Sequence, residues 1–339
     1  MKKVLFDILH PGHLHFFNKT FEKLKYKNIE PIICTRNKEI TIQLADEMKL
    51  KHFILSSKPQ SSCLLPLEAM QRWSNLSKII RAQKPILLVG VMGVFVAPIG
   101  KKFKIPSLVF YDTETATLTN FLTFLLASRV CVPTCYQGFT FKNTIHYNSY
   151  QTFAALYERV QLKKRINIDT AQEPIFVFRF VSRESSHEFF ETSVSWKIRI
   201  NWVNALKNIG KIIISSEESL PEELRPYQWS GGFSDFHQLL ENANFVFSES
   251  ATVCSEAACL GVRSFYLSDS KRGYLGELEA KYKLIQSIPD FRRGTFADEL
   301  KRGMILESFN PYFENNYKKL LEDKIDPNSF ILEQICSLC

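Results

Sequence analysis

Residues 3–34 read KVLFDILHPGHLHFFNKTFEKLKYKNIEPIIC, and this stretch decides the fold of the chain. Its first seven residues form a nearly continuous apolar run, which is typical of a strand buried in a parallel sheet. Apolar residues then recur every three or four positions, as on one face of a helix. The residues of that face are Leu14, Phe17, Phe21 and Leu24. A second apolar run at 29–34 predicts the next strand, so the stretch is a strand–helix–strand unit.

The same alternation continues along the chain in two series. In the first series we predict strands at 53–55, 86–91, 106–111 and 130–132, and helices at 39–48, 67–80, 94–103 and 118–126. In the second we predict strands at 175–181, 211–215, 244–247 and 264–267, and helices at 196–206, 236–242, 253–260, 275–282 and 296–304. The chain is therefore predicted to be α/β, with two tandem Rossmann-like domains, each built on a parallel sheet. The helical residues from 312 onward either close the second domain or cross back to the first.

The charge of the chain divides where the two series meet. Residues 1–165 hold 24 Lys and Arg against 10 Asp and Glu, whereas residues 166–339 hold 19 against 25. We therefore predict an N-terminal domain over 1–165 and a C-terminal domain over 166–339. The basic first domain favours an anionic partner.

Composition excludes several classes of protein. A chain that is 45% hydrophobic and 23% charged is too apolar to be disordered. Its uncharged stretches are too short to span a bilayer, and Asp7 comes too early for a signal peptide, so we expect a cytoplasmic protein without a transmembrane helix. Its eight cysteines are expected to be free thiols. Only Cys336 and Cys339 have the Cys-x-x-Cys spacing, and no second Cys pair or His pair completes a zinc set. A zinc site of His10, His13 and His15 is the less favoured alternative, because alternate residues would point apart, so neither a metal nor a cofactor is expected.

Candidate functional residues follow the predicted strands, because ligands of parallel sheets bind beyond the carboxyl ends of the strands. His10, Gly12 and His13 form a tight turn that opens a helix. His13 is either a general base or a partly buried residue that caps the turn. Asp112 and Glu114 follow the fifth strand, where they suit acid–base chemistry or hydroxyl binding. The alternative is that Asp112 or Thr113 merely caps the next helix.

The second domain offers three further segments. Arg179, Ser182 and His187 leave its first strand in a cluster that suits phosphate or sugar hydroxyls, with a solvated loop as the alternative. Ser216 and Glu217 end its second strand and give a weaker signal.

The most specific segment is residues 247–261, FSESATVCSEAACLG. A strand ends there in small hydroxyl residues, and a short helix begins with its N–H groups exposed, which can hold a pyrophosphate without a lysine. Glu256, one turn into the helix, can reach a ribose diol, although an acid there also suits the helix dipole.

At these segments the sequence resembles the GT-B superfamily, the two-Rossmann architecture of many glycosyltransferases and of the non-hydrolysing UDP-N-acetylglucosamine 2-epimerases. It resembles more closely the microbial family called domain of unknown function 354. The motifs that carry the resemblance are DILHPGHLHFF at 7–17, YDTE at 111–114, RFVS at 179–182 with Ser186 and His187, SSE at 215–217 and SATVCSEAACLG at 250–261.

The resemblance implies an interdomain cleft that holds a nucleotide sugar, with UDP as the expected nucleotide. Ser250, Ala251 and Thr252 would face the diphosphate and Glu256 the ribose, with Ser182, Ser216 and Glu217 as further nucleotide contacts. The acceptor would lie near the turn of His10 and Gly12 and near Asp112, and His13 would deprotonate its hydroxyl. Arg179 or the loop to His187 would stabilise the leaving diphosphate.

The sequence departs from the family pattern at two positions. Thr115 stands where His is expected, and Arg183 stands where Trp is expected. Either change is consistent with an altered specificity.

The resemblance favours a glycosyltransferase of surface polysaccharide or glycolipid synthesis, acting on an anionic or lipid-linked glycan acceptor. Such a protein would be cytoplasmic or peripheral at the inner face of the membrane through its basic N-terminal domain, with no nucleic acid partner. One alternative is an epimerase or hydrolase of nucleotide sugars, with Asp112 and Glu114 as acid–base pair. Another is a non-catalytic protein that binds sugar nucleotides.

Overall fold

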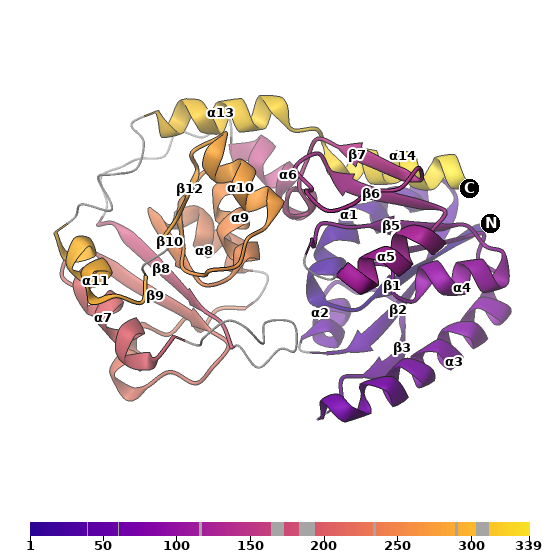
Figure 1. Cartoon of the computed structure of the whole chain (residues 1–339), viewed down its shortest axis with the longest axis horizontal. Helices are drawn as coiled ribbons and strands as arrows, with labels where there is room; N and C mark the ends of the chain where they lie inside the picture. The colour runs from indigo at the N-terminus through magenta and orange to yellow at the C-terminus, as the bar shows by residue number, and fades with distance from the viewer. Residues whose placement is uncertain are drawn as a thin grey trace. The chain divides into compact units, whose positions relative to one another are not determined.

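The structure is a computed structural model that describes residues 1–38, 40–59, 61–114, 117–163, 173–182, 194–232, 235–288, 291–302 and 312–339. These residues form two compact units, Met1–Tyr157 with Ile325–Cys339, and Glu158–Lys324 (Figure 1). The chain passes from one unit to the other earlier than the predicted boundary at residue 165. The sequence left open whether the C-terminal helices close the second domain or cross back to the first. The last helix crosses back, because Ile325–Cys339 belong to the first unit.

The first unit is built on a sheet of seven parallel strands in the order β3-β2-β1-β4-β5-β6-β7. The strands are β1 (Lys2–Ile8), β2 (Ile29–Asn37), β3 (His52–Ser57), β4 (Leu87–Val91), β5 (Ser107–Phe110), β6 (Arg129–Pro133) and β7 (Thr144–Tyr147). Strands β2 and β3 lie on one side of β1, and β4 to β7 lie on the other, as in doubly wound sheets. The carboxyl ends of β1 and β4 therefore flank the expected ligand position.

Helices cover both faces of this sheet in two layers (Figure 1). One layer holds α1 (Pro11–Tyr26), α2 (Thr41–Glu47), the start of α6 (Gln151–Lys163) and α14 (Pro327–Leu338). The other holds α3 (Leu65–Gln83), which follows a short 3₁₀ turn at Ser62–Leu64, together with α4 (Val96–Phe103) and α5 (Thr117–Leu126). Because successive strand residues point to opposite faces, Phe6 packs under the first layer and Leu5 under the second.

The second unit is built on five parallel strands in the order β12-β11-β10-β8-β9. The strands are β8 (Ile175–Phe180), β9 (Lys211–Ser216), β10 (Phe245–Ser248), β11 (Arg263–Tyr266) and β12 (Ile285–Ser287). The helical segments are α7 (Trp196–Leu206), the 3₁₀ helix η2 (Glu222–Tyr227), α8 (Phe236–Asn242), α9 (Ala251–Cys259), α10 (Gly273–Ala280), α11 (Gly294–Lys301) and α13 (Phe313–Asp323). Phe247 stacks between Phe178 and Phe265 at centroid distances of 5.0 and 4.8 Å, which ties the central strands together.

The predicted α/β fold with two parallel sheets is confirmed, and the predicted strands and helices are all present within a few residues. Within the described residues, the elements that were not predicted are β7, β12 and α6, together with the two short 3₁₀ helices. The two strands have only four and three residues, TIHY and IQS, which are too short to show a period. Their positions come from pairing with β6 and β11.

Two predictions about the chain as a whole can be compared with the structure. All eight cysteines are free thiols, as predicted. Among the described residues, no helix combines the length and the apolar character that a membrane span requires.

Helix α14 packs into the core of the first unit although it lies at the far end of the sequence. Its Ile331 and Ile335 are fully buried under the α1 side of the sheet, and the ring of its Phe330 stacks on Tyr147 at 4.9 Å. Arg129 Nη1 donates to Gln334 Oε1 at 2.8 Å. The C-terminal helix is therefore part of the first hydrophobic core.

Truncation of a buried α14 side chain should destabilise the first unit. We expect Ile335→Ala to lower the free energy of unfolding by about 2–5 kcal/mol, because it leaves a cavity in a packed core. Cys336→Ala, at the exposed neighbouring position, is the matched control and should change it by less than about 0.5 kcal/mol. Urea unfolding followed by circular dichroism measures both, and equal effects would show that α14 is not part of the core.

Candidate functional site

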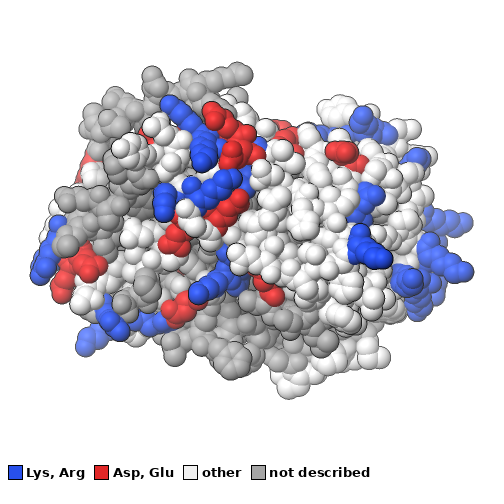
Figure 2. All heavy atoms as spheres, turned by 45° about the horizontal axis from the view of Figure 1, so that its top comes forward, with Lys and Arg blue, Asp and Glu red and all other residues white. Residues whose placement is uncertain are grey.

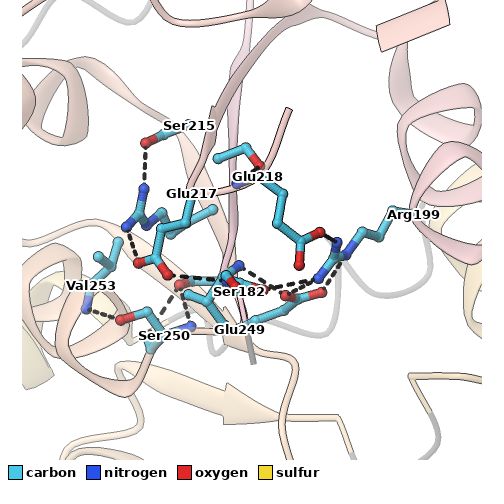
Figure 3. Close-up of polar contacts among 12 residues, drawn as sticks. Ser182, Arg199, Ser215, Glu217, Glu218, Glu249, Ser250 and Val253 are labelled. Carbon is cyan, nitrogen blue, oxygen red and sulfur yellow. Dashed lines mark hydrogen bonds and ion pairs between the residues drawn. The ribbon is translucent and has the colours of Figure 1, made fainter. Parts of the chain in front are cut away.

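The junction between β10 and α9 is the predicted phosphate-binding segment of the second unit. Strand β10 ends at Ser248 and α9 begins at Ala251, so only Glu249 and Ser250 lie between them. Ser250 is the N-cap residue, and its hydroxyl accepts the N–H of Val253 at 3.4 Å (Figure 3). The remaining N–H groups of the first turn point beyond the carboxyl end of the strand, where an anion is stabilised.

Arg179 and Glu217 lie at the ends of the neighbouring strands β8 and β9. Arg179 Nη1 donates to Ser215 Oγ at 2.9 Å, and its Nη2 forms an ion pair with Glu217. The other carboxylate oxygen of Glu217 accepts the N–H of Ser182 at 3.0 Å (Figure 3). The structure thus brings the predicted site residues Arg179, Ser182 and Glu217 together at the carboxyl end of the sheet. The Arg179 guanidinium, however, is paired with the Glu217 carboxylate.

The other predicted residues of this unit are placed as follows. Ala251 and Thr252 occupy the first turn of α9, and Thr252 is exposed. Ser216 Oγ accepts the N–H of Glu218 at 3.1 Å. Glu256 is half-buried, and its Oε1 lies 3.6 Å from Nε2 of His237 on α8. His187 falls outside the described residues.

A buried ion pair that the sequence analysis missed holds this edge in place. Arg199 on α7 donates from Nε and Nη2 to the two oxygens of Glu249, at 2.9 and 2.7 Å, and both side chains are almost completely buried. Arg199 also donates to Glu218 Oε2 at 3.0 Å, and Glu249 Oε2 accepts the N–H of Val181 at 3.0 Å (Figure 3). Glu249 precedes the cap residue Ser250, so the pair positions the start of α9 against the end of β8.

The turn after β1 is the predicted site of the first unit. His10 is the N-cap residue of α1, and its Nδ1 accepts the N–H of Gly12 at 3.1 Å. Pro11 occupies the first helical position, where its missing N–H is no loss. A Cβ at Gly12 would lie 3.3 Å from the His10 ring nitrogen, which is a tight contact. The capping ring therefore leaves little room for a larger residue at this position.

The protonation of His13 follows from its contacts. Burial lowers the pKa of His13 well below its ordinary value of 6.5, helped by the charges of His10, Lys38 and Arg72. The imidazole is therefore neutral at pH 7. Its Nδ1 accepts the N–H of Leu9 at 3.3 Å, and since a backbone N–H only donates, the ring proton lies on Nε2. In this tautomer Nε2 carries the ring proton and can donate a hydrogen bond, and the role of His13 as a general base stays a prediction.

A second buried ion pair anchors the same edge of the first sheet and was also missed. Asp7, in β1, is 2% exposed and pairs with Nη2 of Arg72 on α3. Arg72 Nη1 donates to Thr35 O at 3.1 Å and to Ser56 Oγ at 3.2 Å. Glu68 continues the network by accepting from Ser56 at 2.9 Å. The network joins the ends of β1, β2 and β3.

Asp112 and Glu114 follow β5, and His13 follows β1, so all three lie beyond the carboxyl end of the first sheet. Strand β4 lies between β1 and β5. Asn120 Nδ2 donates to Thr113 O at 3.0 Å, which holds the segment, and Thr113 Oγ1 donates to Asp112 Oδ1 at 3.2 Å. Two buried phenols lie nearby. Burial and the charges of Glu114 and Asp112 raise the pKa of Tyr136 to about 12. Burial, followed by the charge of Asp112, raises the pKa of Tyr147 well above 10, so both hydroxyls keep their protons.

The described residues include no group of three or more His, Cys, Asp or Glu side chains arranged to hold a metal ion. The carboxylates at both sheet edges are instead held largely by arginines and N–H groups.

The order of the strands and helices defines the fold class of the protein. Two parallel sheets with alternating helices form the GT-B fold, and solved structures of that class match nearly the whole chain. The UDP-GlcNAc 2-epimerase from Methanocaldococcus jannaschii is 14% identical, with 99% of this chain and 100% of that chain covered, at a TM-score of 0.67. The spinosyn rhamnosyltransferase SpnG is 12% identical, with 98% and 100% covered, at 0.67. The UDP-GlcNAc 2-epimerase from Neisseria meningitidis, solved bound to UDP-GlcNAc, is 13% identical, with 98% of each chain covered, at 0.66.

The chain belongs to the family described as Protein of unknown function (DUF354), whose family model matches residues 2–271. The resemblance drawn from the sequence motifs is thereby confirmed. No protein of curated function matches the sequence. At 12–14% identity the three solved structures establish the fold and leave the activity to the residues of this chain.

Removal of only one partner of the buried Arg199–Glu249 pair should lower the stability of the fold. We expect Arg199→Met to lower the free energy of unfolding by about 3–5 kcal/mol, because Glu249 stays buried without its partner. The double variant Arg199→Met/Glu249→Leu should regain most of that loss. Arg159→Met is the control, since its 2.8 Å pair with Glu241 is 40% exposed on the arginine side and should contribute about 1 kcal/mol or less. Urea unfolding measures all three, and a double variant as unstable as the single one would contradict the assignment.

His13 should make the fold sensitive to acid. Its folded pKa is lowered, so the stability it contributes is present above the unfolded pKa of about 6.5 and is lost as pH falls below that value. The loss should approach about 1.4 kcal/mol for each pH unit below 6.5 until the folded ring protonates. His13→Asn should therefore flatten the decrease in unfolding free energy between pH 7 and 5.5. His146→Asn, at an exposed position, is the control and should leave the decrease as in the unaltered chain.

Proposed function

We propose that the protein is a GT-B enzyme that transfers a sugar from a UDP-sugar to an acceptor hydroxyl. The observation that carries the proposal is the junction of β10 and α9, where a capped helix start, Glu256 and Arg179 lie at one sheet edge. Two of the solved structures with this fold are named for UDP-GlcNAc, and a third is a rhamnosyltransferase. The acceptor is assigned to residues at the carboxyl ends of the strands of the first sheet.

The donor is held by the second unit in this proposal. The diphosphate lies on the N–H groups of Ala251 and Thr252 in the first turn of α9, and the ribose diol hydrogen-bonds to the Glu256 carboxylate. Arg179 exchanges Glu217 for a phosphate oxygen when the nucleotide binds. Its charge then stabilises the diphosphate as negative charge develops on the leaving oxygen.

The first unit supplies the acceptor side. The acceptor oxygen forms a bond to the anomeric carbon, the bond from that carbon to the diphosphate oxygen breaks, and UDP leaves with the electron pair. Asp112 takes the proton of the acceptor hydroxyl, whereas His13 Nε2 donates a hydrogen bond that orients the acceptor. The basic balance of residues 1–165 suits an anionic or lipid-linked glycan acceptor, as in surface polysaccharide synthesis.

A second candidate is an epimerase or hydrolase of a nucleotide sugar. The pair of carboxylates at the end of β5, Asp112 and Glu114, favours it, because proton removal and return at a sugar carbon needs two such groups. The protonated phenol of Tyr136 beside them adds a proton donor.

Nucleotide binding and turnover separate these functions. The unaltered protein is titrated with UDP by calorimetry and incubated with UDP-sugars with and without glycan acceptors. UDP released only with an acceptor supports the transferase, and UDP or a new sugar formed without one supports the second candidate. Binding without turnover on any pair of substrates would indicate a non-catalytic sugar-nucleotide protein.

Two variants test the residue assignments. Glu256→Ala should weaken UDP binding by roughly 10- to 100-fold, the loss expected for a charged hydrogen bond, while Glu299→Ala on the exposed face of α11 should leave it unchanged. Asp112→Asn should keep UDP affinity and lower turnover by about 100-fold or more. Native UDP affinity in Glu256→Ala would remove the ribose assignment.

A further inference from the structure

Helix α5 carries no charge and exposes an apolar face. Residues 117–126, TLTNFLTFLL, carry no charge, and Asn120, Thr123 and Phe124 are buried toward the sheet. The opposite face exposes Phe121 and Leu122 at 48% each and Leu125 at 56%. A helix on the surface of a soluble protein normally turns a polar face outward, so this face is suited to a partner.

The exposed apolar surface continues into the loop between β6 and β7. Phe139 in that loop is 40% exposed, and its ring centroid lies 6.4 Å from that of Phe121. Phe141, which is half-buried, lies 5.9 Å from both rings. We call Phe121, Leu122, Leu125 and Phe139 the apolar patch.

Basic side chains border the apolar patch. The last turn of α4 and the residues after it expose Lys101 and Lys104, whereas Lys102 between them lies over the Trp73 ring of α3, 5.4 Å from its centroid. Mutual hydrogen bonds of Ser107 and Ser128, at 3.0 and 3.1 Å, join the start of β5 to the chain just after α5. Lys142 is exposed directly after Phe141. We call Lys101, Lys104 and Lys142 the basic rim.

Carboxylates are scarce in the stretch of chain that forms the apolar patch and the basic rim. Residues 84–157 contain no Asp or Glu except Asp112 and Glu114, which follow β5 at the sheet edge. In Figure 2, Lys and Arg side chains gather at the right-hand end of the view. An apolar patch with a rim of one sign matches the interfacial region of an anionic bilayer, where rings and leucines enter the acyl boundary and lysines meet lipid phosphates.

A second copy of the chain fits this surface less well. A two-fold dimer would place the same patch on both sides of the interface. The basic rims would then face each other without carboxylates between them, and like charges oppose such an association. A bilayer offers the opposite sign and demands no matching shape.

We propose that α5, the end of α4 and the loop between β6 and β7 form a docking surface for the face of an anionic membrane. The apolar patch enters the interface, and the basic rim binds the phosphates of anionic lipids. The proposal rests on this surface alone and stands independently of the proposed sugar transfer.

Vesicle flotation tests the surface with the full chain. The protein should float with vesicles of phosphatidylglycerol and phosphatidylcholine, and not with phosphatidylcholine alone. Lys101→Glu/Lys142→Glu should weaken this partitioning by roughly tenfold or more, since each basic residue near an anionic surface contributes substantially to binding. Raising the salt concentration from 0.05 to about 0.5 M should weaken binding of the unaltered chain in the same direction.

Matched controls separate the patch from general charge and hydrophobicity. Leu125→Ser should reduce binding by roughly tenfold, and the double variant Phe121→Ser/Leu125→Ser by more, whereas Tyr26→Ser, an exposed aromatic at the end of α1, should not change it. Lys25→Glu/Lys27→Glu applies the same charge change to the α1 side and should leave most of the binding intact. Circular dichroism melting shows that each variant is folded, and Leu125→Ser keeps the test open if the double variant is not.

Two results would overturn the proposal. One is the absence of binding to anionic vesicles at low salt, or binding that all the patch and rim variants retain. The other is a concentration-dependent dimer, seen by sedimentation velocity, that Leu125→Ser dissociates while lipid binding is unchanged. That result would assign the patch to a second copy of the chain.

Discussion

In each unit a carboxylate at the end of a central strand is buried against an arginine from a helix. Asp7 of β1 pairs with Arg72 of α3, and Glu249 after β10 pairs with Arg199 of α7. Buried charges are tolerated only when each is paired and hydrogen-bonded, so these pairs determine where the helices sit on the sheet edges. The turn after β1 and the start of α9 are built on these anchors, and the candidate site of each unit depends on its own pair.

Ion pairs in the second unit are consistent with the proposed binding of an anionic ligand by an acidic domain. The second predicted domain has more Asp and Glu than Lys and Arg, but the acids at its sheet edge are engaged. Glu249 is held by Arg199, and Glu217 by Arg179 and the N–H of Ser182. What faces outward at the junction of β10 and α9 is therefore a helix start with its N–H groups. Local geometry outweighs net charge there, because charges within a few ångströms interact more strongly than distant ones screened by salt.

Much of the fold and part of the candidate site could be predicted. Long apolar runs and helical periods predicted the strands and helices, and the strand-end rule placed His13, Asp112, Arg179 and Ser250 at sheet edges, where the structure has them. The rule missed Arg72 and Arg199, because each lies inside a helix far along the chain from its carboxylate. A signal existed in both cases: Asp7 interrupts an apolar run, and Arg199 stands among apolar helix residues. Each buried charge requires a partner of opposite sign, but the sequence does not show which residue that partner is.

The sequence alone determined the order of elements, the parallel sheets and the family, because hydrophobic period and strand-end motifs are local properties. Only the tertiary structure decided the rest. It joined α14 to the first core, placed the edge strands β7 and β12, and paired the buried charges. It also set the proton of His13 on Nε2 through the N–H of Leu9 and left the outer face of α5 exposed. These features depend on contacts between residues distant in sequence or on burial, and a local pattern carries no information about either.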